Sequence, residues 1–318
     1  MANRTGARRA VTGLLVLTAL VYAPTLRHPF AYEDQNWLAN IPVEPPLSLP
    51  SRSLTYLSQH LTWRFAGFEP PLYPAVNVGL HLVNGLLVYG VVSQLAPAAA
   101  VPATSIFLLH RLNSAPVAYV TGRADLLMTT AVLLAMLCAL AGGWWLVGLV
   151  PALVLAAMSK ESGIVAAPLV ALTLRLFRRE TWTARYVGYG AVIAAGALCG
   201  LVSHDLMRVF TAAPVVGGAA IPWHEHASHQ LAMTWHLLTL AVWPFGFSID
   251  HDVLAIGPLA HLLAYLFTLQ ALVLVVWAWP RAPILAWCLA VPMIAVAPRF
   301  VFHTSEFITE VQLYLPMV

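Results

Sequence analysis

Charged residues are scarce in this sequence, and their scarcity decides the class of protein. Of 318 residues only 9% are Asp, Glu, Lys or Arg, whereas 60% are hydrophobic. Soluble domains average about 25% charged residues, so a soluble domain is excluded. Apolar runs nearly tile the chain, and helices satisfy every backbone hydrogen bond within lipid. We therefore predict an all-α polytopic membrane protein that forms a single integral membrane domain, residues 1–318.

Other absences exclude further functions. The sequence has no P-loop, no Gly-rich nucleotide motif, no internal repeat and no basic stripe, so nucleic acid is not a predicted partner. Its three cysteines, Cys138, Cys199 and Cys288, lie in apolar runs without the spacing of metal ligands. The histidines between residues 203 and 257 lack the paired spacing of a zinc site. No metal-ligand set is predicted from these patterns.

The positions of the arginines orient the predicted spans. Basic residues precede the first apolar run and gather again in the loop after residue 177, so both are expected in the cytoplasm. The N-terminus is then cytoplasmic, and about ten crossings are expected. The predicted spans cover residues 10–26, 73–95, 97–112, a segment ending near 141, 144–158, a segment ending at 177, 186–202, 258–279 and 282–298.

Two large outer regions follow from this topology. The first, residues 27–72, contains an amphipathic stretch in which Leu54, Leu57, Leu61 and Phe65 recur at helical spacing, so we predict a helix lying on the membrane surface. The second covers residues 203–257. Its apolar part, residues 230–247, is expected to be a re-entrant or interfacial element because it begins and ends on the outer side.

The same topology gathers most of the charged side chains of the membrane domain on the outer face. Counting crossings from the cytoplasmic loop places there Glu33, Asp34, Arg111, Arg123, Asp125, Lys160 and Glu161. Snorkelling residues would be scattered over both faces, so this clustering indicates a site. Plainer interpretations remain open at this point: a solvated loop for Glu33 and Asp34, a local ion pair between Arg123 and Asp125, and a structural ion pair at Lys160 and Glu161.

Three polar residues in the second span share one helix face. Asn77, His81 and Asn84 are separated by four and three positions. Polar groups inside a bilayer must face protein or a cavity. The spacing therefore predicts either a stripe of hydrogen bonds between helices or the lining of a cavity.

Six segments, in this order, resemble the motifs of one family. They are FAYEDQNWLAN from residue 30, RSLTYLSQHL from 52 with LYPAVNVGLHLVNGLLVY from 72, FLLHRLNSAPVAYVTGRADLL from 107, MSKESG from 158, VWPFGFSID from 242 and EVQLYLP from 310. Together they resemble the GT-C-fold polytopic glycosyltransferases, of the transmembrane and tetratricopeptide-repeat O-mannosyltransferase type and their bacterial relatives. No repeats occur in this chain.

The resemblance implies a function and a site. It implies transfer of a sugar from a polyprenyl-phosphate carrier to a protein or glycan acceptor on the outer, periplasmic face of a bacterial inner membrane. Glu33 and Asp34 would act as the catalytic carboxylates. The remaining site residues would be His110, Arg111, Arg123, Asp125, Lys160 and Glu161 toward the donor phosphate, and Asn77, His81, Asn84, Glu310 and Tyr314 along the cavity. The cofactor is left undetermined, and a divalent metal bridging carboxylates to phosphate is compatible with this chemistry.

The sequence also departs from the family pattern. Ala115 stands where the family has a glutamate, and Val311 stands where it has an arginine. These departures support an alternative, a catalytically impaired relative that acts as a structural or binding subunit with a membrane-protein partner.

Overall fold

The computed structural model describes residues 2–30, 34, 52–177, 190, 215–216, 219–220, 222–243, 245, 257–301 and 310–318. Glu33 and the predicted span over 186–202, apart from residue 190, lie outside these residues. The described part is helical except for two short antiparallel strands, β1 (Val215–Val216) and β2 (Ala219–Ala220). The all-α prediction is confirmed.

Five helices of the described part are long and apolar enough to cross a membrane. They are α1 (Ala2–Tyr22) with the 3₁₀ turn Ala23–Arg27 that continues it, α4 (Leu72–Leu95), α7 (Arg123–Ala141), α12 (Pro258–Arg281) and α13 (Pro283–Val296) with the short helix α14 (Pro298–Val301) after it. They correspond to predicted spans. The total of about ten crossings stays a prediction.

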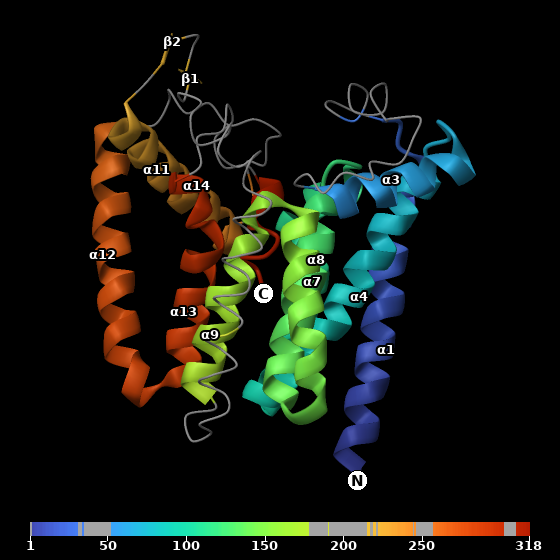
Figure 1. Cartoon of the computed structure of the whole chain (residues 1–318), viewed down its shortest axis with the longest axis horizontal. Coiled ribbons are helices and arrows are strands. Elements are labelled where there is room, and N and C mark those ends of the chain that lie inside the picture. The colour runs from blue at the N-terminus through green and yellow to red at the C-terminus, as the bar shows by residue number, and fades with distance from the viewer. Residues whose placement is uncertain are drawn as a thin grey trace.

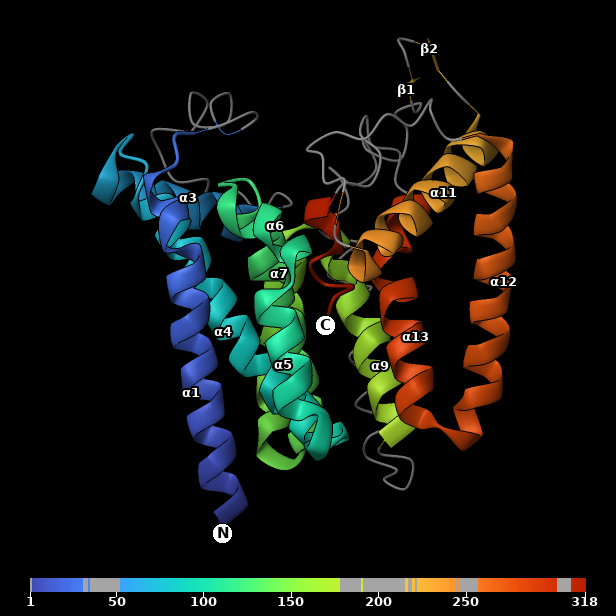
Figure 2. The ribbon, with the colours of Figure 1, turned by 180° about the vertical axis from the view of Figure 1, so that it is seen from behind.

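Three apolar helices are shorter than a span of about 20 residues requires. These are α5 (Ala100–Leu109), α8 (Leu149–Ser159) and α9 (Ala166–Phe177). The sequence predicts one continuous helix for each of the spans 97–112 and 144–158. In the structure both spans begin with a 3₁₀ turn, Pro97–Ala99 and Gly143–Gly148. Proline and glycine at these starts explain the shortening. Figures 1 and 2 show the three helices running alongside the long ones.

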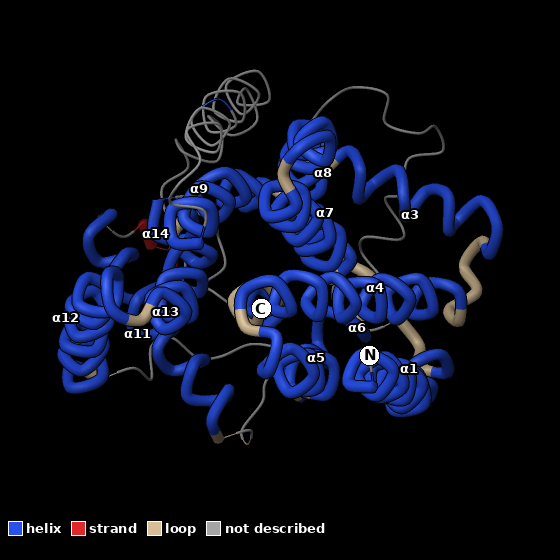
Figure 3. Tube along the Cα trace, turned by 90° about the horizontal axis from the view of Figure 1, so that it is seen from below, coloured by secondary structure: helices blue, strands red, loops and turns tan. Residues whose placement is uncertain are grey.

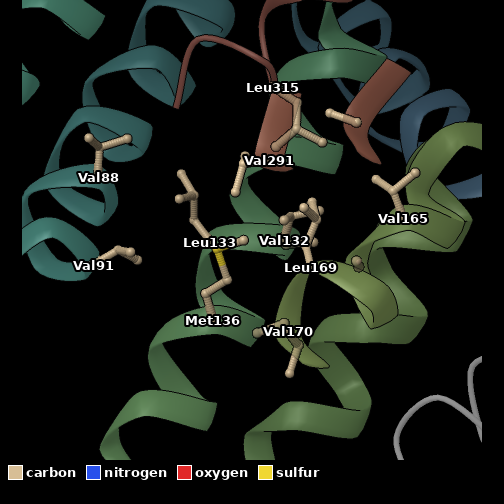
Figure 4. Packing of buried hydrophobic residues seen from close by; sticks show 14 of the residues in the cluster. Val88, Val91, Val132, Leu133, Met136, Val165, Leu169, Val170, Val291 and Leu315 are labelled. Atoms are coloured by element: carbon tan, nitrogen blue, oxygen red, sulfur yellow. The ribbon is translucent and has the colours of Figure 1, made fainter. Parts of the chain in front are cut away.

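The core is centred on α7, which is buried on nearly all sides by α4, α8 and α9. Val132, Leu133 and Met136 of α7 lie between valines of α4 and the side chains of α9 and α13 (Figure 4). A helix that is apolar all round is expected in this position. By contrast, α12 buries only alanines, Ala264, Ala271 and Ala278, and stands at the edge of the molecule opposite α1 (Figures 2 and 3).

The ends of the helices form two distinct faces (Figure 1). One face holds the N-terminus of α1, the C-terminus of α9 and the turn between α12 and α13, and these segments carry exposed arginines, Arg8, Arg9, Arg175 and Arg281. The other face holds α3 (Ser53–Ala66), the start of α7 and α14. The predicted sidedness of the charges therefore matches the fold, and the cytoplasmic assignment of the basic face rests on the positive-inside rule.

Helix α3 lies crosswise at the end of the bundle (Figure 1) and confirms that the amphipathic stretch is helical. Its polar side chains Thr55, Gln59 and Thr62 are buried against the protein, whereas Leu61 and Phe65 are exposed. This orientation is suited to lipid on the outward side, and contact with the membrane surface stays a prediction. The apolar stretch after residue 230 belongs to a longer helix, α11 (Trp223–Val242). This helix runs obliquely beside α12 (Figure 2).

Candidate functional site

Asp34 lies at the end of the bundle where α7 begins, and it is hydrogen-bonded to the segment that leads into this helix. Its side chain is buried, with the residue 3% exposed. Oδ2 accepts a hydrogen bond from the Val120 amide and Oδ1 accepts one from the Thr121 amide, each at 3.1 Å. Burial raises the pKa of Asp34, while these amides and the nearby Arg123 guanidinium oppose the rise. Both oxygens of this predicted catalytic carboxylate are thus engaged by the protein.

Arg123 joins three helices at the same place. It is fully buried in the first turn of α7. Nε donates to Asn77 Oδ1 (2.9 Å), Nη1 donates to the Ser58 carbonyl (3.2 Å) and Thr62 Oγ1 (2.8 Å), and Nη2 donates to the Tyr73 carbonyl (3.0 Å). The fork of guanidinium donors therefore ties α3, α4 and α7 together.

The local ion pair between Arg123 and Asp125, one of the interpretations of the sequence, is not formed. Instead, both oxygens of Asp125 accept from Lys160 Nζ, at 2.7 and 2.6 Å, and both side chains are nearly inaccessible to solvent. Asp125 also lies in the first turn of α7, where the helix dipole favours a negative charge. The ion pair thus joins the start of α7 to the end of α8.

Glu161 pairs with an arginine that the sequence analysis did not select. Arg52 Nε donates to both Glu161 oxygens, at 2.8 and 3.0 Å. Arg52 precedes α3 with φ of 68°, a left-handed conformation that is uncommon for a residue other than glycine. Nothing in the spacing of Arg52 indicates Glu161 as a partner. The signal in the sequence that could have selected Arg52 is its position at the start of RSLTYLSQHL, one of the segments that resemble the family motifs.

Arg299 adds a third positive charge beside Lys160 and Arg52. Burial lowers the pKa of Lys160, Asp125 opposes the change, and the positive charges of Arg299 and Arg52 lower the pKa further. Burial alone would raise the pKa of Glu161, but Arg52, a backbone hydrogen bond and Lys160 together hold that pKa below its usual value. We name these five residues, Arg52, Asp125, Lys160, Glu161 and Arg299, the charged cluster. Among the described residues the cluster joins three cations and two carboxylates.

Two glycines of the family-like segments allow this close packing. A Cβ on Gly122 would overlap the backbone of Pro116, and a Cβ on Gly163 would overlap the Ala156 carbonyl. Each glycine lies within three residues of a charged side chain of the site, Arg123 or Lys160. Their lack of a side chain lets the backbone before Arg123 and after Lys160 pack directly on the preceding helical turn.

The predicted polar face of α4 is fully buried, and its polar atoms bond to other parts of the protein. Besides the Arg123 contact, Asn77 Nδ2 donates to the Tyr119 carbonyl at 2.6 Å. Asn84 Nδ2 donates to the Leu126 carbonyl and to Tyr314 Oη, at 3.0 and 3.2 Å. These contacts are those expected of the stripe of hydrogen bonds between helices.

His81 and Tyr314 fasten the C-terminal segment to this stripe. His81 Nε2 lies 3.0 Å from the Leu108 carbonyl, and a carbonyl only accepts, so Nε2 carries the proton. His81 Nδ1 then accepts from the Tyr314 hydroxyl at 2.7 Å. Tyr314 is fully buried, and burial raises its pKa well above the ordinary value. The hydroxyl therefore stays protonated and acts as a neutral link between α4 and the chain end.

Replacing Tyr314 with phenylalanine is expected to lower the free energy of unfolding by about 1–3 kcal/mol, because His81 Nδ1 loses its buried donor. The thermal midpoint of the purified protein in detergent measures this. Tyr265→Phe is the control, because Tyr265 is 52% exposed on α12 and its loss should change stability by no more than about 0.5 kcal/mol. Equal destabilisation by both variants would contradict the assigned role of Tyr314.

The remaining predicted residues lie around the same end. His110 Nε2 donates to the Ala241 carbonyl of α11 at 3.0 Å, and its Nδ1 accepts from the Leu112 amide. Arg111 is exposed in a 3₁₀ turn that contacts the turn Glu310–Leu313. The side chain of Glu310, like the whole of Glu33, lies outside the described part. Ala115, in the short helix α6 (Ser114–Ala118), supplies no carboxylate.

The described residues do not form a metal-binding group. Within them, no set of three or more His, Cys, Asp or Glu side chains is placed to hold a metal ion. The acidic side chains of the site that the structure describes, Asp34, Asp125 and Glu161, are bound to amides or cations.

Comparison with known proteins adds a relative. The chain is 29% identical over 237 residues to Protein O-mannosyl-transferase Tmtc1 of Drosophila melanogaster. This similarity supports a relationship with membrane glycosyltransferases. The match covers 65% of this chain and 27% of that protein, so the chain spans about a quarter of the length of its curated relative. No family model matches, and no solved structure matches.

Proposed function

We propose that this protein is an integral membrane glycosyltransferase that transfers a sugar from a polyprenyl-phosphate carrier to a protein or glycan acceptor on the outer face. The observation that carries the proposal is the meeting of Asp34, Arg123 and the charged cluster at one end of an apolar helical bundle. The similarity to an O-mannosyl-transferase supports the reaction type and suggests mannose as the first sugar to test.

The charged cluster is the part of this end best suited to the donor phosphate. Departure of a lipid phosphate needs fixed positive charge where negative charge develops. All four hydrogen bonds of Arg123 go to protein atoms, so we assign it to positioning. Arg52, Lys160 and Arg299 bring three positive charges together in this cluster, and fixed positive charge of this kind would attract the donor phosphate. A carboxylate from the acidic pair would orient or deprotonate the acceptor.

The exposed side of α3 would place the lipid carrier beside this cluster. Leu57, Leu61 and Phe65 are exposed along this helix, and Arg52 directly precedes it. An amphipathic helix in the interfacial plane buries such a face among lipid tails. A polyprenyl chain held there would keep its phosphate at the depth of Arg52.

A transfer assay tests the proposal. The full chain in proteoliposomes would be given polyprenyl-phosphate mannose and a mixture of serine- and threonine-containing peptides, and mannosylated product would be measured. Arg299→Gln is expected to raise the KM for the donor about tenfold or more, because charge-assisted bonds to phosphate are about twice as strong as neutral ones. Arg281→Gln is the control, because Arg281 lies exposed on the opposite face.

The result separates the proposal from its rival. Absence of transfer by the unmodified protein with any polyprenyl-phosphate sugar would contradict the enzyme assignment. An equal effect of Arg299→Gln and Arg281→Gln would place the donor phosphate elsewhere.

A second candidate is a binding or structural subunit without turnover. The observation that favours it is the engagement of Asp34, His110, Arg123 and Lys160 by other parts of this chain, together with Ala115 at a position where the resembling family has an acid. Co-purification with a stoichiometric membrane-protein partner, in the absence of transfer, is the result expected for this candidate.

A further inference from the structure

Both oxygens of the Asp34 side chain already accept hydrogen bonds from the protein. A base must present an oxygen to the proton it removes. Asp34 directs one oxygen to each of two consecutive amides, Val120 and Thr121. Turning the carboxylate toward an acceptor would leave both amides without these partners, and unsatisfied buried donors are costly.

The two amides belong to the turn that leads into the arginine junction. Gly122, whose Cα faces the Pro116 backbone without room for a side chain, follows directly. Arg123 comes next and binds α3 and α4 through neutral acceptors, so none of its hydrogen bonds within the described part of the chain goes to a carboxylate. The Asp34 carboxylate and the Arg123 guanidinium are close enough to attract each other electrostatically. Asp34 thus supplies both hydrogen-bond acceptors and counter-charge at this junction.

We propose that Asp34 is a positioning residue, which anchors the first outer loop to the start of α7 beside Arg123. The proposal rests on the proposed function in one respect, that the loop carries the acceptor-activating carboxylate, Glu33. Consecutive Cα atoms are about 3.8 Å apart. Anchoring residue 34 therefore restricts where the backbone of residue 33 can be, whatever its side chain does.

The test compares Asp34→Asn, Asp34→Ala and Glu33→Gln in the full chain. Asparagine keeps the shape and one acceptor oxygen but cannot act as a base, and alanine removes the anchor. Turnover is measured with polyprenyl-phosphate mannose well below each thermal midpoint and normalised to folded protein. We expect kcat to fall about tenfold for Asp34→Asn and about 100-fold for Asp34→Ala, because misplacement of about 1 Å costs on that order. Glu33→Gln should lose about 10²–10⁴-fold, the contribution of a general base.

A readout independent of turnover accompanies these rates. Asp34→Ala should lower the thermal midpoint in detergent by about 5 °C, and Asp34→Asn should lower it by less. The graded loss of kcat from Asn to Ala in folded protein is not expected of a residue that only stabilises the fold.

Each outcome decides the matter. Loss of turnover by Asp34→Asn as complete as that of Glu33→Gln, with an unchanged midpoint, would overturn the proposal and make Asp34 a reacting group. An unchanged midpoint for Asp34→Ala would overturn the anchor whether or not the protein transfers sugar. If the unmodified protein is inactive and the midpoint still falls for Asp34→Ala, the proposed function fails while the anchor stands.

Discussion

Arg123→Lys is expected to lower the free energy of unfolding by about 4 kcal/mol, one of the two largest effects of any single replacement considered. Lysine has three donors on one atom and cannot reproduce the planar fork. We expect about two of the four hydrogen bonds that Arg123 makes to be lost in this buried site. Each such loss costs about 1–3 kcal/mol. Because domains are stable by only about 5–15 kcal/mol, little folded protein should survive heating.

Denaturant titration of the detergent-solubilised protein measures this change. Arg111→Lys is the matched control, since Arg111 lies at the same end of the bundle but is exposed, and it should shift stability by about 0.5 kcal/mol or less. A loss for Arg123→Lys no larger than this would show that the buried fork does not hold α3, α4 and α7 together.

Asp125→Asn is expected to cost about 3–5 kcal/mol, because it leaves the Lys160 ammonium buried without its carboxylate. Arg299 and Arg52 add to the penalty by repulsion. Lys160→Gln should cost a similar amount by leaving Asp125 unpaired. The double variant Asp125→Asn with Lys160→Gln should recover a substantial part of the loss, since two neutral amides can bond to each other.

The neighbouring pair provides the control for this cycle. Arg52 and Glu161 have side chains 40% and 22% exposed, so water replaces much of what Glu161→Gln removes. That replacement should cost about 1 kcal/mol or less. Additive losses in the Asp125 and Lys160 cycle, with no recovery in the double variant, would show that the two charges do not stabilise each other.

Much of the site could be predicted from the sequence, because the side on which a charge lies follows from the order of apolar helices and charged residues along the chain. Once arginines assign two ends to a set of apolar helices, every charge between them falls on a known side. That argument placed Asp34, Arg123 and Lys160 at one end, where the structure has them. The four- and three-residue steps from Asn77 to Asn84 likewise predicted one face of α4, since helical period alone determines which side chains point together.

The pairing of those side chains could not be read in the same way. Partners such as Asp125 and Lys160, or Arg52 and Glu161, are separated by 35 and 109 positions, and no local pattern relates them. The local choice, Arg123 with Asp125, was wrong because both residues lie in the first turn of α7, and their side chains bind different neighbours.

Glu33 and Asp34, the acidic pair of the predicted site, illustrate the difference between what the sequence predicts and what the tertiary structure decides. Composition and the apolar runs by themselves indicated a helical membrane protein, and the arginine positions predicted that Asp34 lies at the same end as Arg123 and Lys160. Only the tertiary structure decided that this carboxylate accepts the amides of Val120 and Thr121. The physical reason is that a carboxylate binds whichever donors the folded backbone brings within about 3 Å, and those donors lie 86 and 87 positions away in the chain.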